Sequence, residues 1–222
     1  MFQYCLFDLD GTLTDPKEGI TKSVQYALRK FGIEEPDLDR LEPFIGPPLK
    51  DSLIEFYGFT EEDAIKAIAF YRERFAPIGV LENQIFPGMA QMLENLYNKK
   101  IHLAVASSKP TEFVHQILSH FDIEKYFEVI VGSEMDGSRA TKEEVVEEAL
   151  LQLGLLSCPQ EDRKRVCAMI GDRKFDIQGA KVYGLTGIGV SFGYAGEGEL
   201  EAAGADHIVN TVEELGVLLT QE

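Results

Sequence analysis

Two aspartates, Asp8 and Asp10, lie one residue apart near the start of the chain and are followed directly by Gly11. The apolar run at residues 4–7 predicts a short buried strand that stops at Asp8. Because side chains two residues apart on a strand share a face, both carboxylates could meet at one cation or one reacting phosphorus. An Asp-Gly pair can also form a simple turn, but the whole run of residues 7–15 is too specific for that alternative.

A second pair of carboxylates, Asp172 and Asp176, follows the apolar run at residues 166–170. Carboxylate oxygens are hard ligands of the kind that Mg²⁺ prefers. Asp176 could instead be an acid in the first turn of a helix, where the helix dipole favours a negative charge. Gathered with Asp8 and Asp10, however, these carboxylates would repel one another without a divalent cation. The sequence therefore predicts a Mg²⁺ site.

Ser107, Ser108 and Lys109 follow the apolar run at residues 101–106. A serine hydroxyl there could donate to a phosphate oxygen beside the N–H groups that open the following helix. It could also do no more than cap that helix. Lys109 is harder to explain by helix stability, because a cation at a helix N-terminus opposes the helix dipole.

Lys142 also falls in the first turn of a predicted helix, directly after Thr141, which forms a capping-box pattern with Glu144. A lysine at the edge of a sheet could neutralise charge on a carboxylate nucleophile and on a phosphoryl group. It could equally be an exposed surface residue. The residues leave open whether Lys142 or Lys109 faces the phosphate.

Helices and strands that alternate from residue 87 onward must position these groups. Apolar runs predict strands near residues 101–106, 127–131, 166–170, 187–190 and 207–209, with helices between the first four. Such alternation predicts right-handed βαβ units and an α/β core built on a Rossmann-like, mostly parallel sheet. The polar residues would then meet at the carboxyl ends of the strands, where such sheets bind ligands.

Residues 16–82 carry helical periodicity and no strand signal. They predict an inserted all-helical domain, whereas residues 1–15 and 83–222 predict the α/β core. Within this insert, Lys50 lies beside a Gly-Pro-Pro turn and is a candidate contact for the non-reacting part of a substrate. A solvated surface lysine is the alternative.

The composition excludes several classes of partner. The 222 residues include 38 Asp and Glu against 21 Lys and Arg, which gives a formal charge of −17. So acidic a protein is not expected to bind a nucleic acid polymer or an anionic membrane. No apolar run is long enough to span a bilayer, and the N-terminus lacks the basic lead of a signal peptide. With an odd number of cysteines, reduced thiols and a cytoplasmic location are expected.

The chain resembles the haloacid dehalogenase (HAD) superfamily over its full length. The resemblance is carried by Asp8-x-Asp10-Gly11-Thr12, Ser107, Lys142 and Gly171-Asp172-x-x-x-Asp176. The helical insert resembles the type 1 cap of that family, and the phosphoglycolate-phosphatase-like group is the most similar subfamily. Two motifs depart from its usual pattern: Ser107-Ser108 replaces Thr-Asn, and Lys142 lacks the Lys-Pro-x-Pro context.

This resemblance implies a Mg²⁺-dependent phosphatase that hydrolyses a small phosphorylated metabolite through an aspartyl-phosphate. It implies Asp8 as nucleophile and Asp10 as proton donor and acceptor, with the backbone carbonyl of Asp10 on the metal. A monomer or weak homodimer is expected. The implied catalytic residues are Asp8, Asp10, Ser107 and Lys142, the substrate-binding residues are Gly11, Ser108, Lys109 and Lys50, and the metal-binding residues are Asp8, Asp10, Asp172 and Asp176.

Alternatives within the superfamily remain open, as does a catalytically silent binding protein with the same fold. A 5′-nucleotidase acting on nucleoside monophosphates and a sugar phosphomutase are both compatible with the first motif. A phosphomutase usually carries Glu-Asp where this chain has Gly171-Asp172, and Asp10 argues against a dehalogenase. A phosphonatase would need a lysine in the helical insert that forms a Schiff base. Phosphoglycolate, a nucleoside 5′-monophosphate and a sugar phosphate all remain candidate substrates.

Overall fold

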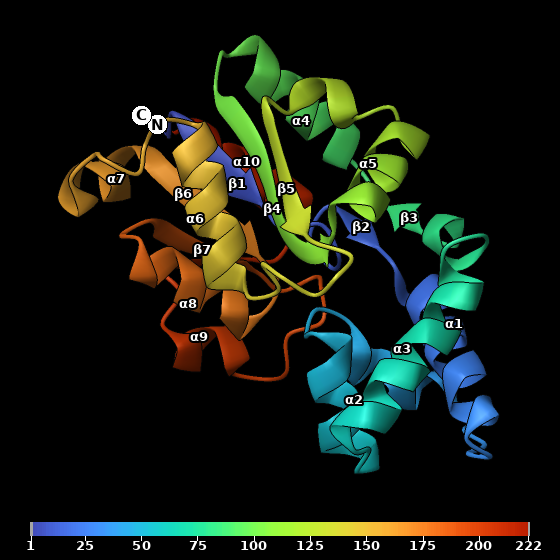
Figure 1. Ribbon diagram of the computed structural model, residues 1–222. Coiled ribbons are helices and arrows are strands. Elements are labelled where there is room, and N and C mark those ends of the chain that lie inside the picture. Colours follow the sequence, from blue (N-terminus) through green and yellow to red (C-terminus); the bar gives the residue numbers. More distant parts are fainter. Residues whose placement is uncertain (1, 222) are drawn as a thin grey trace. The chain divides into compact units, whose positions relative to one another are not determined.

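The chain divides into two units in a computed structural model that describes residues 2–221 (Figure 1). The α/β unit consists of Met1–Asp15 and Ile85–Glu222, and the helical unit is Pro16–Gln84. The second boundary follows Gln84 instead of Glu82, where the sequence predicts it. The boundary falls within β3 (Gln84–Ile85), which pairs with β2 (Thr14–Asp15) in a two-stranded sheet, and strands this short give no periodicity to read.

The α/β unit is built on one six-stranded sheet in which every pair of neighbouring strands is parallel, in the order β5-β4-β1-β6-β7-β8. This arrangement confirms the predicted α/β fold. Strand β1 lies in the middle, and the chain continues from it first to one side and then to the other. The strands are β1 (Tyr4–Phe7), β4 (His102–Pro110), β5 (Val129–Ser133), β6 (Cys167–Gly171), β7 (Thr186–Val190) and β8 (His207–Val209).

Helices cover both faces of this sheet (Figure 1). One face packs against α6 and α8, where Val145, Val146 and Ala180 join the apolar residues of the strands in a buried cluster. On the other face α4 packs against α10. The helices are α4 (Met89–Asn98), α5 (Thr111–His120), α6 (Lys142–Gln152), α7 (Gln160–Val166), α8 (Lys174–Val182), α9 (Glu199–Ala203) and α10 (Val212–Thr220).

Four segments of the α/β unit differ from the sequence prediction. Strand β4 continues to Pro110 instead of ending at residue 106, and its register with β5 shifts between Ala106 and Pro110. Ser107 to Lys109 therefore lie in extended chain, not in the first turn of a helix. Strand β5 spans Val129–Ser133 instead of residues 127–131, and the short 3₁₀ turn Glu124–Tyr126 precedes it. The short helices α7 and α9 were not predicted, since neither is long enough to show an apolar stripe.

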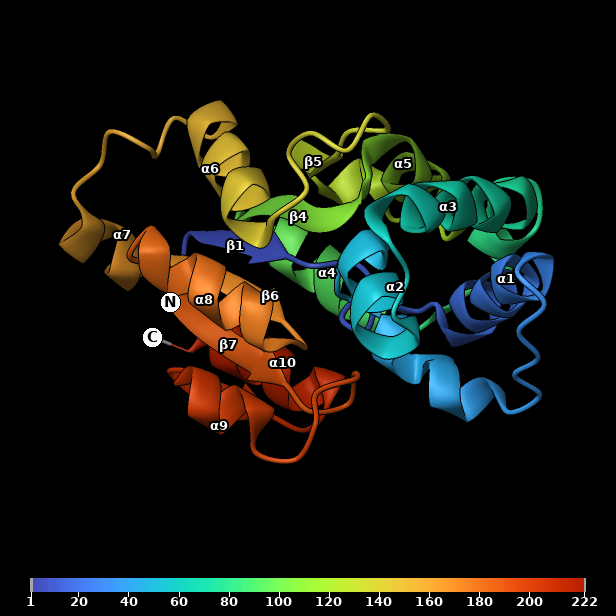
Figure 2. The ribbon, with the colours of Figure 1, turned by 60° about the horizontal axis from the view of Figure 1, so that its bottom comes forward.

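The helical unit contains the three predicted helices, α1 (Lys17–Lys30), α2 (Leu49–Tyr57) and α3 (Glu61–Phe75), as Figure 2 shows. Two 3₁₀ helices, Leu38–Phe44 and Gly79–Leu81, were not predicted. Where α1 begins, the backbone of Gly19 approaches the end of the unit so closely that a Cβ there would lie 2.0 Å from the Gly79 carbonyl oxygen.

Two sequence-level expectations about the whole chain can be compared with the structure. All three cysteines are free thiols, with Cys5 and Cys167 buried in strands. Within residues 2–221, no helix combines the length and the apolar character that crossing a bilayer requires.

Candidate active site

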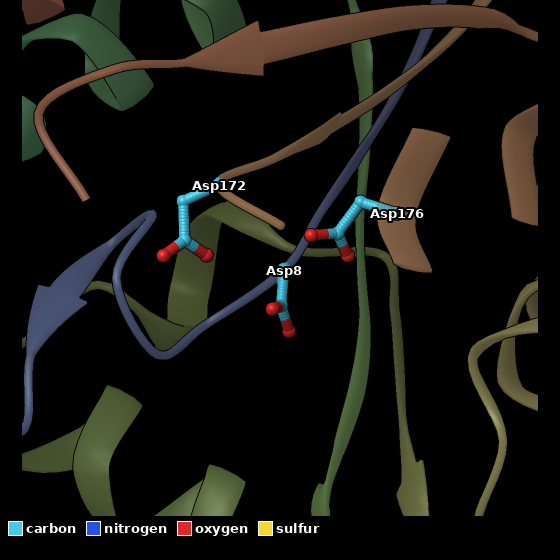
Figure 3. A group of neighbouring side chains, drawn as sticks. All are labelled: Asp8, Asp172 and Asp176. Carbon is cyan, nitrogen blue, oxygen red and sulfur yellow. The ribbon is translucent and has the colours of Figure 1, made fainter. Parts of the chain in front are cut away.

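Three buried carboxylates converge at the carboxyl ends of β1 and β6. Asp8 follows β1, and its backbone N–H donates to the Ile170 carbonyl oxygen at 2.9 Å, which ties it to the end of the neighbouring strand. Asp172 follows β6, and Asp176 lies in the first turn of α8. Figure 3 shows the three side chains gathered around one place, and one oxygen from each lies within 4.8 Å of the others.

The Asp172 carboxylate is held by close backbone packing. A Cβ at Gly11, whose φ is +78°, would lie 2.1 Å from Asp172 Oδ2, and a Cβ at Gly193 would lie 2.3 Å from Asp172 Cβ. Only glycine fits at these two positions. The backbone N–H of Tyr194 donates to Asp172 Oδ2 at 2.8 Å, and the Tyr194 hydroxyl donates to Asp15.

Gly193 and Tyr194 were not predicted as site residues, because no role was assigned to the residues that directly follow the strand at 187–190. The signal was available, because a Ser-Phe-Gly-Tyr run at the carboxyl end of a core strand is placed where such sheets bind ligands. Gly11, in contrast, was expected to bind substrate. That N–H donates to the Thr14 carbonyl oxygen at 2.8 Å, so the role of Gly11 visible here is its close approach to Asp172.

Lys142 neutralises part of the carboxylate cluster. Its Nζ lies 2.9 Å from Asp8 Oδ1 and 2.8 Å from Asp176 Oδ1, and it donates to the Ala106 carbonyl oxygen at 3.0 Å. The side chain is only 4% exposed, so it is not a surface lysine. The capping box at Thr141 is confirmed and places Lys142 at the start of α6.

Lys109 contacts a different carboxylate. Its Nζ lies 2.6 Å from Asp10 Oδ2, and the two side chains are 6% and 10% exposed. The carboxylate of Asp10 therefore does not join the other three, contrary to the expected four-carboxylate group. The reason is that β1 ends at Phe7 and the N–H groups of Leu13 and Thr14 both turn back to the Leu9 carbonyl oxygen, so the alternation of a strand no longer applies at Asp10.

The two serines in the last part of β4 have different surroundings. Ser107 is buried, and its Oγ accepts a hydrogen bond from the backbone N–H of Lys109 at 3.3 Å. Ser108 is half-buried. Neither caps α5, because that helix begins only at Thr111.

The three carboxylates carry more negative charge than Lys142 alone can neutralise. Burial raises the pKa of Asp172 well above its ordinary value, and the neighbouring Asp176 and Asp8 raise it further. Burial likewise raises the pKa of Asp176 to about 6, against the lowering effect of Lys142. Burial alone would lower the pKa of Lys142, but its contacts with Asp176 and Asp8 outweigh that effect and raise it.

This set of donors fits a small divalent cation. The three carboxylates offer hard oxygen ligands. Although Lys142 lies close to Asp8 Oδ1 and Asp176 Oδ1, neither oxygen accepts a hydrogen bond of good geometry, so both retain lone pairs for a ligand. Thr12 donates to Asp172 Oδ1 only weakly, at 3.4 Å.

Lys50, the candidate substrate contact in the helical unit, lies at the start of α2. Its Nζ donates to Glu61 Oε2 at 3.2 Å at the start of α3, and its side chain is 41% exposed. Within that unit, Lys50 therefore forms a surface ion pair.

Comparison with known proteins identifies the family. A model of the haloacid dehalogenase-like hydrolase family matches residues 5–190. A 5′-nucleotidase of Pseudomonas aeruginosa is 48% identical over 202 residues, which cover 91% of this chain and 88% of that protein. The crystal structure of a predicted phosphatase from Clostridium acetobutylicum superposes with a TM-score of 0.92 at 46% identity, covering 99% of this chain and 98% of that one.

Other relatives carry different names. The tyrosine-protein kinase PtkA of Mycobacterium tuberculosis is 39% identical over 192 residues, which cover 86% of this chain and 63% of that protein. Phosphoglycolate phosphatase 1 of P. aeruginosa is 27% identical over 197 residues, which cover 85% of this chain and 69% of that protein.

Proposed function

Since the chain belongs to the haloacid dehalogenase-like hydrolase family, we propose that it is a Mg²⁺-dependent phosphatase that works through a phosphoryl group on Asp8. The observation that carries this proposal is the buried group of Asp8, Asp172 and Asp176 with Lys142 against Asp8. Burying so many charges is costly for stability, so chemistry explains them better than folding does.

In the first step, a carboxylate oxygen of Asp8 attacks phosphorus, and the bond between phosphorus and the ester oxygen breaks. Asp10 gives its proton to the departing alcohol. In the second step, water attacks the phosphorus of the aspartyl-phosphate and loses a proton to Asp10, which restores Asp8 and releases phosphate. Asp10 thus ends the cycle in the protonation state in which it began.

The remaining residues support these steps. Lys142 offsets the negative charge of Asp8 when a phosphate dianion approaches. Ser107 would hold a phosphoryl oxygen, and its burial at the end of β4 supports this role. Mg²⁺, held through Asp8 and Asp172 with Asp176 beside them, would supply further positive charge at the phosphoryl group.

We propose nucleoside 5′-monophosphates as the first substrate class and phosphoglycolate as the second. The order rests on the 48% identity to the relative named 5′-nucleotidase, against 27% for the relative named phosphoglycolate phosphatase 1. A panel of phosphometabolites, assayed for phosphate release with Mg²⁺, tests this order. Adding ATP with a tyrosine-containing peptide to the panel tests for the tyrosine kinase activity that the name of a third relative indicates.

Asp8→Asn tests the proposed chemistry itself. We expect it to abolish release of phosphate from p-nitrophenyl phosphate. Asp10→Asn should lower kcat for the same substrate by about 10²–10⁴-fold, because the attack of water on the aspartyl-phosphate still needs Asp10 as a base. Asp122→Asn, at a side chain that is 85% exposed, is the matched control and should retain full activity. Turnover by Asp8→Asn in the presence of Mg²⁺, or full wild-type activity in excess EDTA, would refute the proposal.

A further inference from the structure

Lys109 is the second buried lysine beside the candidate nucleophile loop, and the chemistry described so far gives it no task. Its Nζ lies 2.6 Å from Asp10 Oδ2 in surroundings that exclude most solvent. A buried lysine is costly unless its charge is compensated, so a contact this short fixes both side chains. The other buried lysine, Lys142, instead contacts Asp8, Asp176 and the Ala106 carbonyl oxygen.

The backbone at Lys109 is also held in place. A Cβ on Gly132 of the adjacent strand β5 would lie 2.4 Å from the Lys109 carbonyl oxygen, so the two chains pass in close contact. The Lys109 N–H donates to Ser107 Oγ at 3.3 Å. The ammonium therefore extends from a fixed point of β4 toward the Asp10 carboxylate.

The two oxygens of that carboxylate differ. Oδ2 contacts Lys109, whereas Oδ1 is buried and has no hydrogen-bond partner among the described residues. A buried carboxylate oxygen without a partner is costly in a folded protein and calls for an explanation. A leaving-group oxygen or an attacking water would supply the missing partner, because proton transfer needs a heavy-atom separation of about 2.6–3.2 Å.

We propose that Lys109 is a positioning residue, which anchors Asp10 Oδ2 so that Oδ1 is directed at the proton it must exchange. This role rests on the proposed phosphatase function and differs from direct substrate binding, which the sequence suggested for Lys109. Lys109 acts through Asp10, so its loss matters most where the leaving group needs a proton.

The test compares kcat/KM for an alkyl phosphate with kcat/KM for p-nitrophenyl phosphate, in the wild type, Lys109→Met and Lys109→Arg. This parameter reports the steps up to release of the alcohol, so the later attack of water does not enter. We expect Lys109→Met to lower it by about 10²-fold for the alkyl phosphate, which needs a proton donor. For p-nitrophenyl phosphate, whose phenolate leaves without a proton, the change should be small.

Two further measurements separate positioning from binding. Lys109→Arg keeps the positive charge and should recover part of the activity on the alkyl phosphate. In Asp10→Asn, adding Lys109→Met should cause no further loss, because residues that act as a unit are not additive. Lys125→Met, at an exposed lysine of the same unit, is the matched control and should behave as the wild type.

Several outcomes would overturn this role. An equal loss on both substrates with a raised KM would assign Lys109 to phosphate binding. An additive loss in the Asp10→Asn background would show that Lys109 acts independently of Asp10. If Lys109→Met fails to fold, the substrate comparison is made on Lys109→Arg, and an equal effect on both substrates there counts against positioning. A wild type without phosphatase activity, in contrast, would refute the proposed function and this role with it.

Discussion

Charged side chains are placed differently in the two units of the chain. At the carboxyl edge of the sheet, the pairs Lys142–Asp8 and Lys109–Asp10 join side chains that are at most 10% exposed. In the helical unit, Lys50–Glu61 and Lys66–Glu62 join side chains that are at least 41% exposed. The same residue types are therefore buried at the carboxyl edge of the sheet and solvated in these two pairs of the helical unit.

The buried charged pairs serve the proposed chemistry, whereas the exposed charged pairs serve solubility. Exposed ion pairs contribute about 0–1 kcal/mol to stability, whereas burying a charge costs several kcal/mol that its partner only partly returns. An exception in the helical unit is Arg74, whose guanidinium donates to both carboxylate oxygens of Glu82 at 2.7 and 3.0 Å and to Ser23 Oγ at 3.1 Å. Both members of that pair are about four-fifths buried, with exposures of 18% and 21%.

Among the variants that test this difference, Asp172→Asn should have the largest effect. It should lower phosphatase activity and raise stability. We expect phosphatase activity to fall by at least about 10²-fold, since a proposed metal ligand is lost. In EDTA, the melting temperature should rise by about 2–4 °C, because a buried charge is removed while the Asn oxygen can still accept the Tyr194 N–H. A variant less stable than the wild type in EDTA would contradict the view that this carboxylate costs stability.

The stability of the metal-free protein should depend on pH, because the buried Asp176 carboxylate destabilises the folded state when it is charged. The pKa of Asp176 is raised from 3.8 to about 6. Below pH 3.8 both folded and unfolded states bind the proton, and between pH 3.8 and about 6 only the folded state keeps it. The free energy of unfolding should therefore decrease as pH rises through this window and level off above it.

Urea denaturation in EDTA from pH 4 to 7 measures this slope, and Asp176→Asn should lack the contribution of Asp176. Added Mg²⁺ should stabilise the wild type more at pH 7 than at pH 5, because the cation competes with the proton. An identical pH dependence in the wild type and Asp176→Asn would refute the assignment.

Arg74→Met should have an intermediate effect on the helical unit. We expect its unfolding free energy to drop by about 1–3 kcal/mol, since the mostly buried Glu82 carboxylate loses its bidentate partner. Lys66→Met, which removes a surface ion pair on the same helix, should cost less than about 0.5 kcal/mol and is the matched control. Hydrogen exchange of the α3 amides measures both; equal effects would remove the distinction between the two pairs.

Lys50→Ala should have the smallest effect on stability, within about 0.5 kcal/mol, because its ion pair with Glu61 is exposed. If Lys50 contacts substrate, KM for a nucleoside monophosphate should rise while hydrolysis of p-nitrophenyl phosphate stays unchanged. An equal loss on both substrates would assign Lys50 to folding instead of recognition.

The local sequence determined most of the elements and much of the site. Apolar periodicity placed the sheet strands and the long helices, because each must bury one face or stripe. The capping box at Thr141 was correctly read because it depends on residues three positions apart. The aspartates after β1 and β6 were grouped because parallel strands bring their carboxyl ends to one edge.

Only the tertiary structure decided how the charges pair. The sequence could not assign Lys109 and Lys142 to their carboxylates, since each pair joins residues far apart in the chain. It also missed Tyr194, whose N–H reaches Asp172 only because β6 and β7 are neighbours in the sheet. Pairing at a distance depends on register and side-chain direction, and these are fixed by packing that no local pattern encodes.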